Sequence, residues 1–175
     1  LSTSVQAEGK LRLGTEGAYP PFNTIDKDGK VTGFDIDIGN ALCKAMGTEC
    51  EWVTSDWDGL IPALDAKKFD AIVASMSITK ERKEKIDFTS KYYTTPIKCI
   101  REVGKDIDPT DTAKLKGKMV GVQSGVVADN FVRNKFKDIV EVTAYKTQDE
   151  ANLDLLSGRV DLVCADSVVL APFVK

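Results

Sequence analysis

Two serines and one arginine lie close together in the chain and could jointly bind a carboxylate. Ser75, Ser77 and Arg82 follow the apolar run 71–74, which is short enough for a buried strand, and Thr79 is a suitable N-cap for a helix that contains Arg82. A guanidinium can donate two parallel, charge-assisted hydrogen bonds to a carboxylate, and N–H groups at a helix N-terminus add to them. The stretch therefore predicts a site for a small carboxylate. The alternative is an Arg82 that is merely solvated in the first turn of its helix.

The composition disfavours several kinds of chemistry. The chain of 175 residues contains no histidine, which removes histidine-based triads, histidine general bases and most zinc or copper sites. Charges of both signs are mixed and the formal net charge is −3, which disfavours nucleic acid or an anionic membrane as the main partner. No apolar run approaches the roughly 20 residues of a membrane span, so we expect no insertion into a membrane. We expect no metal and no other cofactor.

The spacing of apolar residues predicts alternating strands and helices, and hence an α/β fold. The adjacent prolines Pro20 and Pro21 predict a loop over 16–22, and the turn residues of 26–30 predict a hairpin. The strands are expected over 11–15, 50–53, 70–74, 119–122, 139–145 and 160–166, and the longer helices over 34–46, 59–67, 126–137 and 148–157.

Local signals predict the ends of several of these helices. Gly47 is typical of the position that ends a helix, and Asp58 is expected to cap the helix 59–67. Thr147 and Glu150 form the pattern of a capping box. The helical period places five residues of the first long helix on one apolar face: Phe34, Ile38, Ala41, Leu42 and Ala45.

The two halves of the chain repeat one plan. Residues 64–75 match residues 155–166 in pattern and spacing, so that Ser75 and Asp166 fall at the same place, just past the carboxyl end of a strand. We therefore expect two β-α-β-α-β lobes, with lobe one over 1–91, lobe two over 92–175 and a hinge near 88–96. Small ligands bind preferentially between such lobes. The alternative is a chance similarity between two ordinary α/β units.

The cysteines and the N-terminal residues favour an exported protein. Residues 4–7 resemble the small-residue end of a secretory signal, and export would permit a disulfide between Cys43 and Cys50. Two buried thiols are the alternative at these positions. Cys99 and Cys164 lie in separate apolar runs, and the sequence leaves their state open.

Four motifs occur together and in order: GTEGAYPPF over 14–22, GFDID over 33–37, WDGLIP over 57–62 and SMSITKER over 75–82. They resemble the bacterial periplasmic polar-amino-acid-binding proteins of ABC importers, most of all the lysine/arginine/ornithine- and histidine-binding group, with octopine and nopaline binders nearby. The resemblance covers essentially the whole chain. It implies the two-lobed periplasmic binding protein fold (type II), a periplasmic location after removal of a signal peptide, and a membrane permease as partner. Because members of that family continue for several more elements, we expect a C-terminal part to be missing.

The resemblance also implies which residues bind the head group of an amino acid. Arg82 would bind the α-carboxylate with support from Ser77 and nearby main-chain N–H groups. Asp166 would accept the α-ammonium, and Ser75 would add a carbonyl or hydroxyl. The complete set of expected ligand-binding residues is Glu16, Tyr19, Trp57, Ser75, Met76, Ser77, Arg82, Gln123, Val126 and Asp166.

Three residues of this set are implied in recognising the ligand's side chain. Tyr19 and Trp57 would hold an alkyl stem or a cation between them, and Glu16 would meet a distal positive charge. The structural alternatives are a loop-packing Tyr19, a Trp57 that belongs to the core and a solvated Glu16. The chain departs from the family at Val126, which offers a backbone N–H but no hydroxyl, and at Ala128, where some members have a glutamine.

Three classes of function are compatible with these residues. The first is a non-enzymatic receptor that captures an amino acid, arginine-like before glutamate-like, for uptake by an ABC transporter. The second is an enzyme on the same fold, similar to the cyclohexadienyl or arogenate dehydratases, for which Glu16 is the obvious candidate acid. The third is the ligand-binding module of a sensor or channel. We expect the receptor, because Arg82 and Asp166 together suit an α-amino acid head group.

Overall fold

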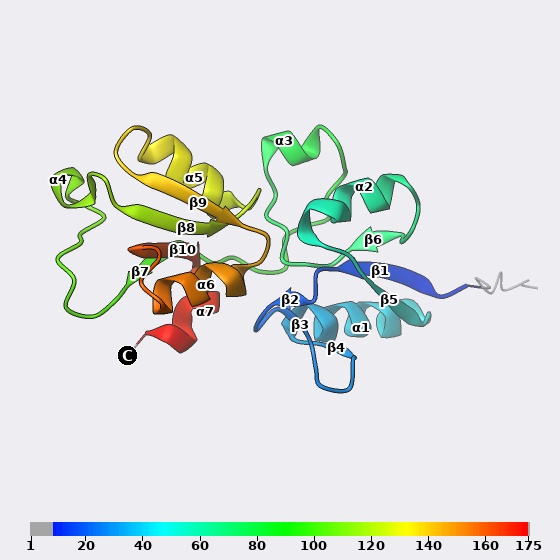
Figure 1. The fold of residues 1–175 in the computed structure, drawn as a ribbon. Helices are drawn as coiled ribbons and strands as arrows, with labels where there is room; N and C mark the ends of the chain where they lie inside the picture. Colours follow the sequence, from blue (N-terminus) through cyan, green and yellow to red (C-terminus); the bar gives the residue numbers. More distant parts are fainter. Residues whose placement is uncertain (1–8, 175) are drawn as a thin grey trace, which may run out of the picture. The chain divides into compact units, whose positions relative to one another are not determined.

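The computed structural model describes residues 9–174, so the signal-like segment 4–7 lies outside the described residues. The chain divides into two compact units with the boundary between Thr89 and Ser90. Each unit contains its own parallel or mixed sheet with helices around it (Figure 1). The two units are described separately below as unit 1 and unit 2.

Unit 1 is built around strand β1 (Leu11–Thr15). Parallel strands β5 (Cys50–Thr54) and β6 (Ala71–Ile72) flank it in the order β5-β1-β6. A second sheet is an antiparallel meander of β2 (Ala18–Tyr19), β3 (Asn23–Ile25) and β4 (Val31–Thr32). The helical elements of this unit are α1 (Phe34–Met46), the 3-10 turn η1 (Trp57–Gly59), α2 (Leu60–Asp65) and α3 (Lys80–Lys83).

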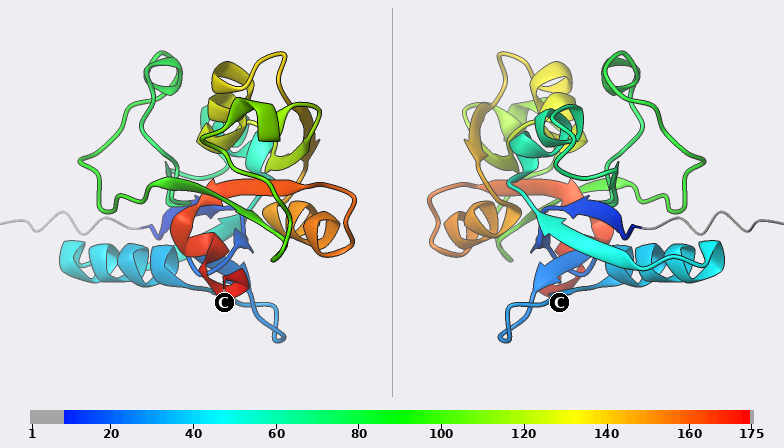
Figure 2. Two further views of the ribbon diagram at one scale, coloured as in Figure 1. Left: turned by 90° about the vertical axis from the view of Figure 1, so that its left-hand side faces the viewer. Right: turned by 90° about the vertical axis from the view of Figure 1, so that its right-hand side faces the viewer.

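Helix α1 packs through a different face from the one that the apolar period indicates. Figure 2 shows α1 lying alongside β5. The residues it buries are Asp35, Ile36, Gly39 and Cys43, whereas Leu42 is 53% exposed. Gly39 explains the choice, because a Cβ there would lie 2.6 Å from the ring of Trp52. Only the face with the glycine allows the helix to approach the sheet this closely.

Unit 2 contains a four-stranded sheet in the order β7-β10-β8-β9, in which only the β7–β10 pair is antiparallel. Its core is formed by buried residues of β8, α5 and β10. The elements of unit 2 are β7 (Ile97–Arg101), α4 (Thr112–Leu115), β8 (Met119–Gln123), α5 (Val127–Lys135), β9 (Glu141–Tyr145), α6 (Gln148–Leu156), β10 (Leu162–Asp166), α7 (Ser167–Leu170) and the 3-10 turn η2 (Ala171–Phe173).

The three parallel strands of each unit follow the same plan. Strand β1 lies between β5 and β6, and β8 lies between β9 and β10. The register also corresponds: Gly14 lies opposite Ile72 in unit 1, and Gly121 lies opposite Val163 in unit 2. The sequence match of 64–75 with 155–166 therefore corresponds to the same helix-to-strand connection in both units.

Most of the predicted elements of the α/β fold are confirmed, and several details are wrong. The helix ends at Gly47, Thr79 and the Thr147–Glu150 capping box are as expected. The loop over 16–22 contains β2, because Ala18 and Tyr19 pair with β3 before the prolines begin. Asp58 does not cap a helix over 59–67: it lies inside η1, and α2 has no side-chain cap.

All four cysteines are paired, and each unit contains one disulfide. Cys43–Cys50 joins the end of α1 to the start of β5, with 5.8 Å between the Cα atoms, which confirms the predicted bond. Cys99–Cys164 joins directly opposite residues of β7 and β10, with 4.1 Å between the Cα atoms. The sequence left this second bond open because β7 was not among the predicted strands.

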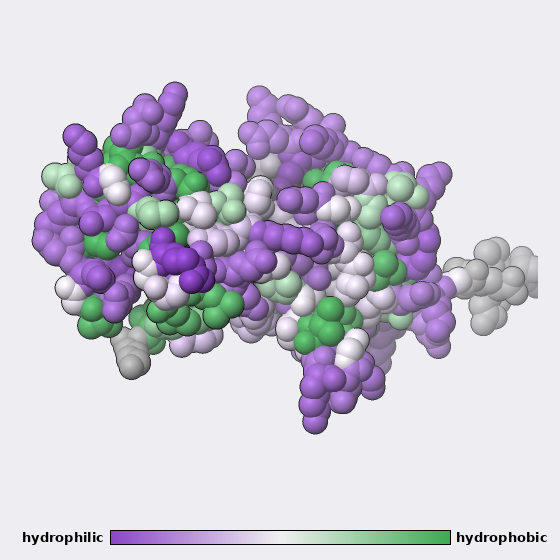
Figure 3. All heavy atoms as spheres, viewed as in Figure 1, coloured by the Kyte–Doolittle hydropathy of each residue, from purple (hydrophilic) through white to green (hydrophobic). Residues whose placement is uncertain are grey.

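Some apolar side chains remain on the surface of unit 2. Figure 3 shows hydrophobic residues over the region of α6 and α7, where Leu153 is 60% and Leu156 is 70% exposed. Among the helices that the structure describes, none has the length and apolar character needed to cross a bilayer.

Candidate functional site

Arg82 is held by its own helix turn and by an aromatic ring. The hydroxyl of Thr79 caps α3 by accepting a hydrogen bond from the backbone N–H of Arg82 at 3.2 Å. The guanidinium carbon lies 5.2 Å from the centre of the Trp57 ring, and Nη1 donates to the carbonyl of Ser77 at 2.8 Å. Three predicted site residues are therefore in contact within unit 1.

The electrostatic surroundings leave Arg82 as a cation. Partial burial lowers the pKa of Arg82 below its ordinary value, and the charge of Glu81 opposes that shift. An arginine nevertheless remains protonated in a protein. A half-buried guanidinium is more weakly hydrated than an exposed one, which strengthens its attraction for an anionic group that reaches it.

Trp57 belongs partly to the core and partly to the site. The ring is half-buried and packs with Met76 against the buried cluster that includes Leu60, Phe69 and Ala74. Arg82 lies over the ring. Trp57 can therefore pack in the core and also belong to the ligand site, because its packing holds the indole in place beneath the guanidinium of Arg82.

Glu16 and Tyr19 are buried rather than solvated. Glu16 is 8% and Tyr19 is 6% exposed. Tyr19 stacks on Phe22 with 6.1 Å between ring centres and an interplanar angle of 18°, as the loop-packing alternative requires. The loop between Glu16 and Tyr19 is fixed by Gly17, whose N–H donates to Asn23 Oδ1 at 2.8 Å.

Ser75 adopts an unusual backbone conformation beside a buried carboxylate. Its φ angle is 48°, in the left-handed region that few non-glycine residues occupy. Its hydroxyl donates to Asp35 Oδ1 at 2.9 Å, and Asp35 Oδ2 accepts from Asn23 Nδ2 at 2.9 Å. Asp35 and Asn23 are both 0% exposed. Sequence reasoning assigned neither a role, although Asp35 lies in the GFDID motif.

The predicted site residues of unit 2 follow two neighbouring parallel strands. Gln123 ends β8 and is 0% exposed, and its Nε2 donates to the carbonyl of Lys146 at 3.2 Å. Asp166 ends β10, is half-buried and precedes α7. The carboxyl ends of parallel strands meet at one edge of a sheet, so this edge carries an amide and a carboxylate.

Helix α5 begins at the same edge without a hydroxyl cap. Val126 occupies the N-cap position and makes no side-chain cap hydrogen bond. Asp129, in the first turn of α5, accepts the N–H of Gly125 at 3.0 Å through Oδ2 and a hydrogen bond from Arg133 Nε at 2.6 Å through Oδ1. The loop before α5 is therefore held to the helix, although Val126 supplies no hydroxyl.

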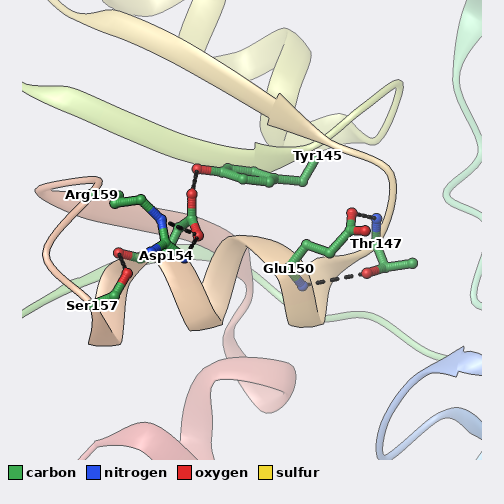
Figure 4. A network of polar contacts seen from close by, with 6 residues as sticks. All are labelled: Tyr145, Thr147, Glu150, Asp154, Ser157 and Arg159. Carbon is green, nitrogen blue, oxygen red and sulfur yellow. Dashed lines mark hydrogen bonds and ion pairs between the residues drawn. The ribbon is translucent and has the colours of Figure 1, made fainter.

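A second polar network in unit 2 ties α6 to β9 (Figure 4). Tyr145 donates its hydroxyl hydrogen to Asp154 at 2.6 Å, and Arg159 contacts the other oxygen of Asp154. Burial and this hydrogen bond raise the pKa of Tyr145 to about 12. The Arg159 guanidinium, followed by the Tyr145 hydroxyl, lowers the pKa of Asp154. Among residues 9–174, no cluster of histidine, cysteine and acidic side chains is suited to hold a metal ion.

Two α/β units with polar groups at the carboxyl ends of their parallel strands define a class of proteins that bind small ligands. Residues 11–122 match the model of the bacterial extracellular solute-binding proteins, family 3. This match covers more than half of the chain, and the chain belongs to that family. The family expected from the four ordered motifs is thereby confirmed.

The chain is similar to several proteins that bind amino acids. It is 50% identical over 166 residues to the L-arginine-binding protein of Pseudomonas aeruginosa, a match that covers 94% of this chain and 63% of that relative. The chain therefore spans less than two thirds of the relative's length.

Two solved structures are similar to the whole described fold. An ancestral arginine-binding protein bound to arginine superposes with a TM-score of 0.90 at 40% identity, over 97% of this chain and 75% of that one. An ancestral amino acid-binding protein described as a precursor of cyclohexadienyl dehydratase gives 0.88 at 35% identity, over 94% of this chain and 74% of the other.

Proposed function

We propose that the protein is an extracytoplasmic receptor that binds a basic α-amino acid, arginine before lysine or ornithine, and delivers it to the membrane permease of an ABC importer. In this proposal lobe one over 1–91 and lobe two over 92–175 both contribute to the ligand site, with a hinge near 88–96. The observation that carries it is the half-buried guanidinium of Arg82, held over Trp57 in a chain half identical to an arginine-binding protein.

We expect the head group of the ligand to bind to Arg82 of unit 1 and to Asp166 of unit 2. Arg82 and the nearby Ser77 bind the α-carboxylate, since a planar guanidinium matches a carboxylate with two parallel hydrogen bonds. Asp166 and Ser75 accept hydrogen bonds from the α-ammonium. Val126 offers its backbone N–H at the start of α5, where the helix dipole favours an anion.

The side chain of the ligand is recognised mainly by residues at and beside β2, Glu16 and Tyr19, together with Trp57. Glu16 supplies a negative charge for a distal guanidinium or ammonium, while Tyr19 and Trp57 provide aromatic surface for the alkyl stem. Met76 and Gln123 are the remaining residues expected to line the ligand site. The buried position of Glu16 supports this role, because a carboxylate shielded from water discriminates more strongly between charged and neutral ligands.

The two disulfides support a periplasmic location. Disulfides persist in oxidising compartments such as the bacterial periplasm, and all four cysteines of this chain are paired. The P. aeruginosa relative is named an L-arginine-binding protein. We infer that export occurs through a signal peptide that is removed.

Calorimetric titration of the full-length protein with a panel of amino acids tests the proposal. L-arginine should bind more tightly than L-lysine, L-ornithine, L-glutamine and L-glutamate. Glu16→Gln should lower the affinity for L-arginine by about tenfold or more and the affinity for L-glutamine much less, because only arginine brings a distal charge to the carboxylate. Tight binding of L-glutamate with no response to L-arginine would contradict the assignment.

The dehydratase reading is the second candidate, and the similarity to a precursor of cyclohexadienyl dehydratase is the observation that favours it. That neighbour is itself described as an amino acid-binding protein. Turnover of prephenate or arogenate, followed by the absorbance of the aromatic product, distinguishes the two. The receptor proposal predicts no turnover.

A further inference from the structure

The GFDID motif places a buried carboxylate directly behind a predicted ligand-binding residue. Gly33 precedes α1 with a φ angle of 121°, and a Cβ at this position would lie 2.5 Å from the carbonyl oxygen of Phe22. Only glycine therefore allows α1 to begin against the backbone of Pro21 and Phe22. The result is that Asp35, in the first turn of α1, is 0% exposed and lies beneath Ser75.

The hydrogen bonds around Asp35 have a fixed direction. A backbone N–H can only donate, so the bond from Gly17 places the Oδ1 of Asn23 toward Gly17 and its Nδ2 toward Asp35. Asp35 must then accept through Oδ2. As a carboxylate it also accepts through Oδ1, and the hydrogen in that bond comes from the hydroxyl of Ser75.

The consequence concerns what Ser75 can offer a ligand. A serine hydroxyl has one hydrogen and two lone pairs, and Asp35 takes the hydrogen. Ser75 Oγ therefore presents lone pairs only. Such an oxygen accepts a hydrogen bond but donates none to the ligand. An ammonium group has three hydrogens and can donate to both Ser75 and Asp166, whereas a hydroxyl group has one hydrogen and can donate to only one of them. The nearby negative charge of Asp35 adds to the attraction for a cation.

We propose that Asp35 is a positioning residue that makes the site selective for an α-ammonium over an α-hydroxyl group, by holding Ser75 as a hydrogen-bond acceptor. This inference rests on the proposed function. Asp35 also reaches the segment that carries Glu16 and Tyr19, because its partner Asn23 holds Gly17. One buried carboxylate thus supports both the residues that read the head group and those that read the side chain.

The substitution Asp35→Asn reverses the bond to Ser75. Asn23 still donates to position 35, so the carbonyl of the new amide must face Asn23 and its NH₂ must face Ser75. Ser75 Oγ then accepts from position 35, and its hydrogen is released toward the ligand. A ligand whose α-substituent is a hydroxyl can accept that hydrogen, whereas an ammonium cannot.

The test compares L-arginine with its 2-hydroxy analogue, in which a hydroxyl replaces the α-ammonium, on the full-length protein. The wild type should prefer L-arginine, and Asp35→Asn should reduce the ratio of the two affinities by about tenfold or more. Asp37→Asn is the matched control: Asp37 lies in the same first turn of α1 but is exposed. It should leave the ratio unchanged.

Ser75→Ala provides a second route if Asp35→Asn folds poorly. It should also reduce the ratio, and adding Asp35→Asn to it should cause a much smaller change than Asp35→Asn causes in the wild type, because the hydroxyl is gone and only the longer-range charge of Asp35 is then removed. The inference would be overturned if Asp35→Asn lowered the affinity for both ligands equally and Ser75→Ala left the ratio of the two affinities unchanged. A wild type that binds no basic amino acid would instead overturn the proposed function, and the inference with it.

Discussion

The two units share a backbone plan but place different chemistry at the same position. In each unit an aspartate just before the last parallel strand accepts a hydrogen bond at 2.9 Å from the N–H of the first strand: Asp70 from Arg12, and Asp161 from Met119. The next polar position along the match is Ser75 in unit 1 and Asp166 in unit 2. One unit has a neutral hydroxyl there and the other a carboxylate.

The difference lies in where each unit keeps its negative charge. In unit 2 the carboxylate of Asp166 is itself at the strand end and is half-buried. In unit 1 the carboxylate is one hydrogen bond further back, on Asp35, and Ser75 lies in front of it. Unit 1 also contains the cation Arg82. The same backbone position therefore carries an uncharged hydroxyl in unit 1 and a charged carboxylate in unit 2.

The largest expected effect is on the cation of unit 1. Breaking one partner of a buried ion pair costs about 3–5 kcal/mol, so Arg82→Ala should weaken L-arginine binding by roughly two to three orders of magnitude or more. Arg82→Lys should restore only part of this, because an ammonium cannot form the two parallel bonds. Affinity and melting temperature are measured on the same samples. An Arg82→Ala protein that melts early but binds normally once folded would make Arg82 a structural residue.

Removing the disulfide of unit 2 should destabilise the protein more than removing the disulfide of unit 1. The chain-entropy model gives about 4 kcal/mol for Cys99–Cys164, which spans 65 residues, and about 2 kcal/mol for Cys43–Cys50, which spans 7. The double substitution Cys99→Ser with Cys164→Ser should therefore lower the free energy of unfolding more than the corresponding change in unit 1. Denaturant unfolding of both variants without ligand measures this. A larger loss from the unit 1 pair would reverse the comparison.

The carboxylate of unit 2 should have a smaller effect on binding than Arg82. Asp166→Asn removes the counter-charge of the ligand's ammonium, and the half-buried position of Asp166 suggests a loss of about one to two orders of magnitude in L-arginine affinity. The melting temperature of the ligand-free protein should change little. If Asp166→Asn binds L-arginine as tightly as the wild type, Asp35 and Ser75 alone must account for the ammonium site.

The smallest expected effect is a pH dependence of the unfolding free energy that comes from Tyr145 in unit 2. The pKa of Tyr145 is raised from 10 to about 12, so its stabilising contribution is fully present below pH 10 and is lost as the pH rises toward 12. Tyr145→Phe should cost about 1 kcal/mol of unfolding free energy near neutral pH, and the difference should vanish by about pH 12. In a titration of tyrosinate absorbance, the step near pH 12 should be absent from this variant.

The sequence predicted features that are determined locally. The helix end at Gly47, the Thr79 cap and the Thr147–Glu150 capping box each depend on a few neighbouring residues, and all were as expected. The family was predicted from four motifs in a fixed order, and the match over 11–122 confirms it.

The features that the sequence missed depend on contacts between distant residues. The buried face of α1 depends on Gly39 meeting Trp52, which no helical period contains. The Cys99–Cys164 bond depends on the antiparallel register of β7 and β10. Asp35 lies in the GFDID motif but had no expected role of its own, and only the folded chain places it beneath Ser75, 40 positions away. The roles of the ligand-binding residues stay predictions.

The most direct test of whether Arg82 binds the ligand's α-carboxylate is a cycle of two ligands and two proteins, measured by calorimetry on the full-length protein. The ligands are L-arginine and agmatine, which lacks the α-carboxylate, and the proteins are the wild type and Arg82→Ala. If Arg82 binds the carboxylate, removing either partner should weaken binding by roughly two to three orders of magnitude, and removing both should cost little more than removing one. Agmatine binding that falls as steeply as L-arginine binding in Arg82→Ala would contradict the account.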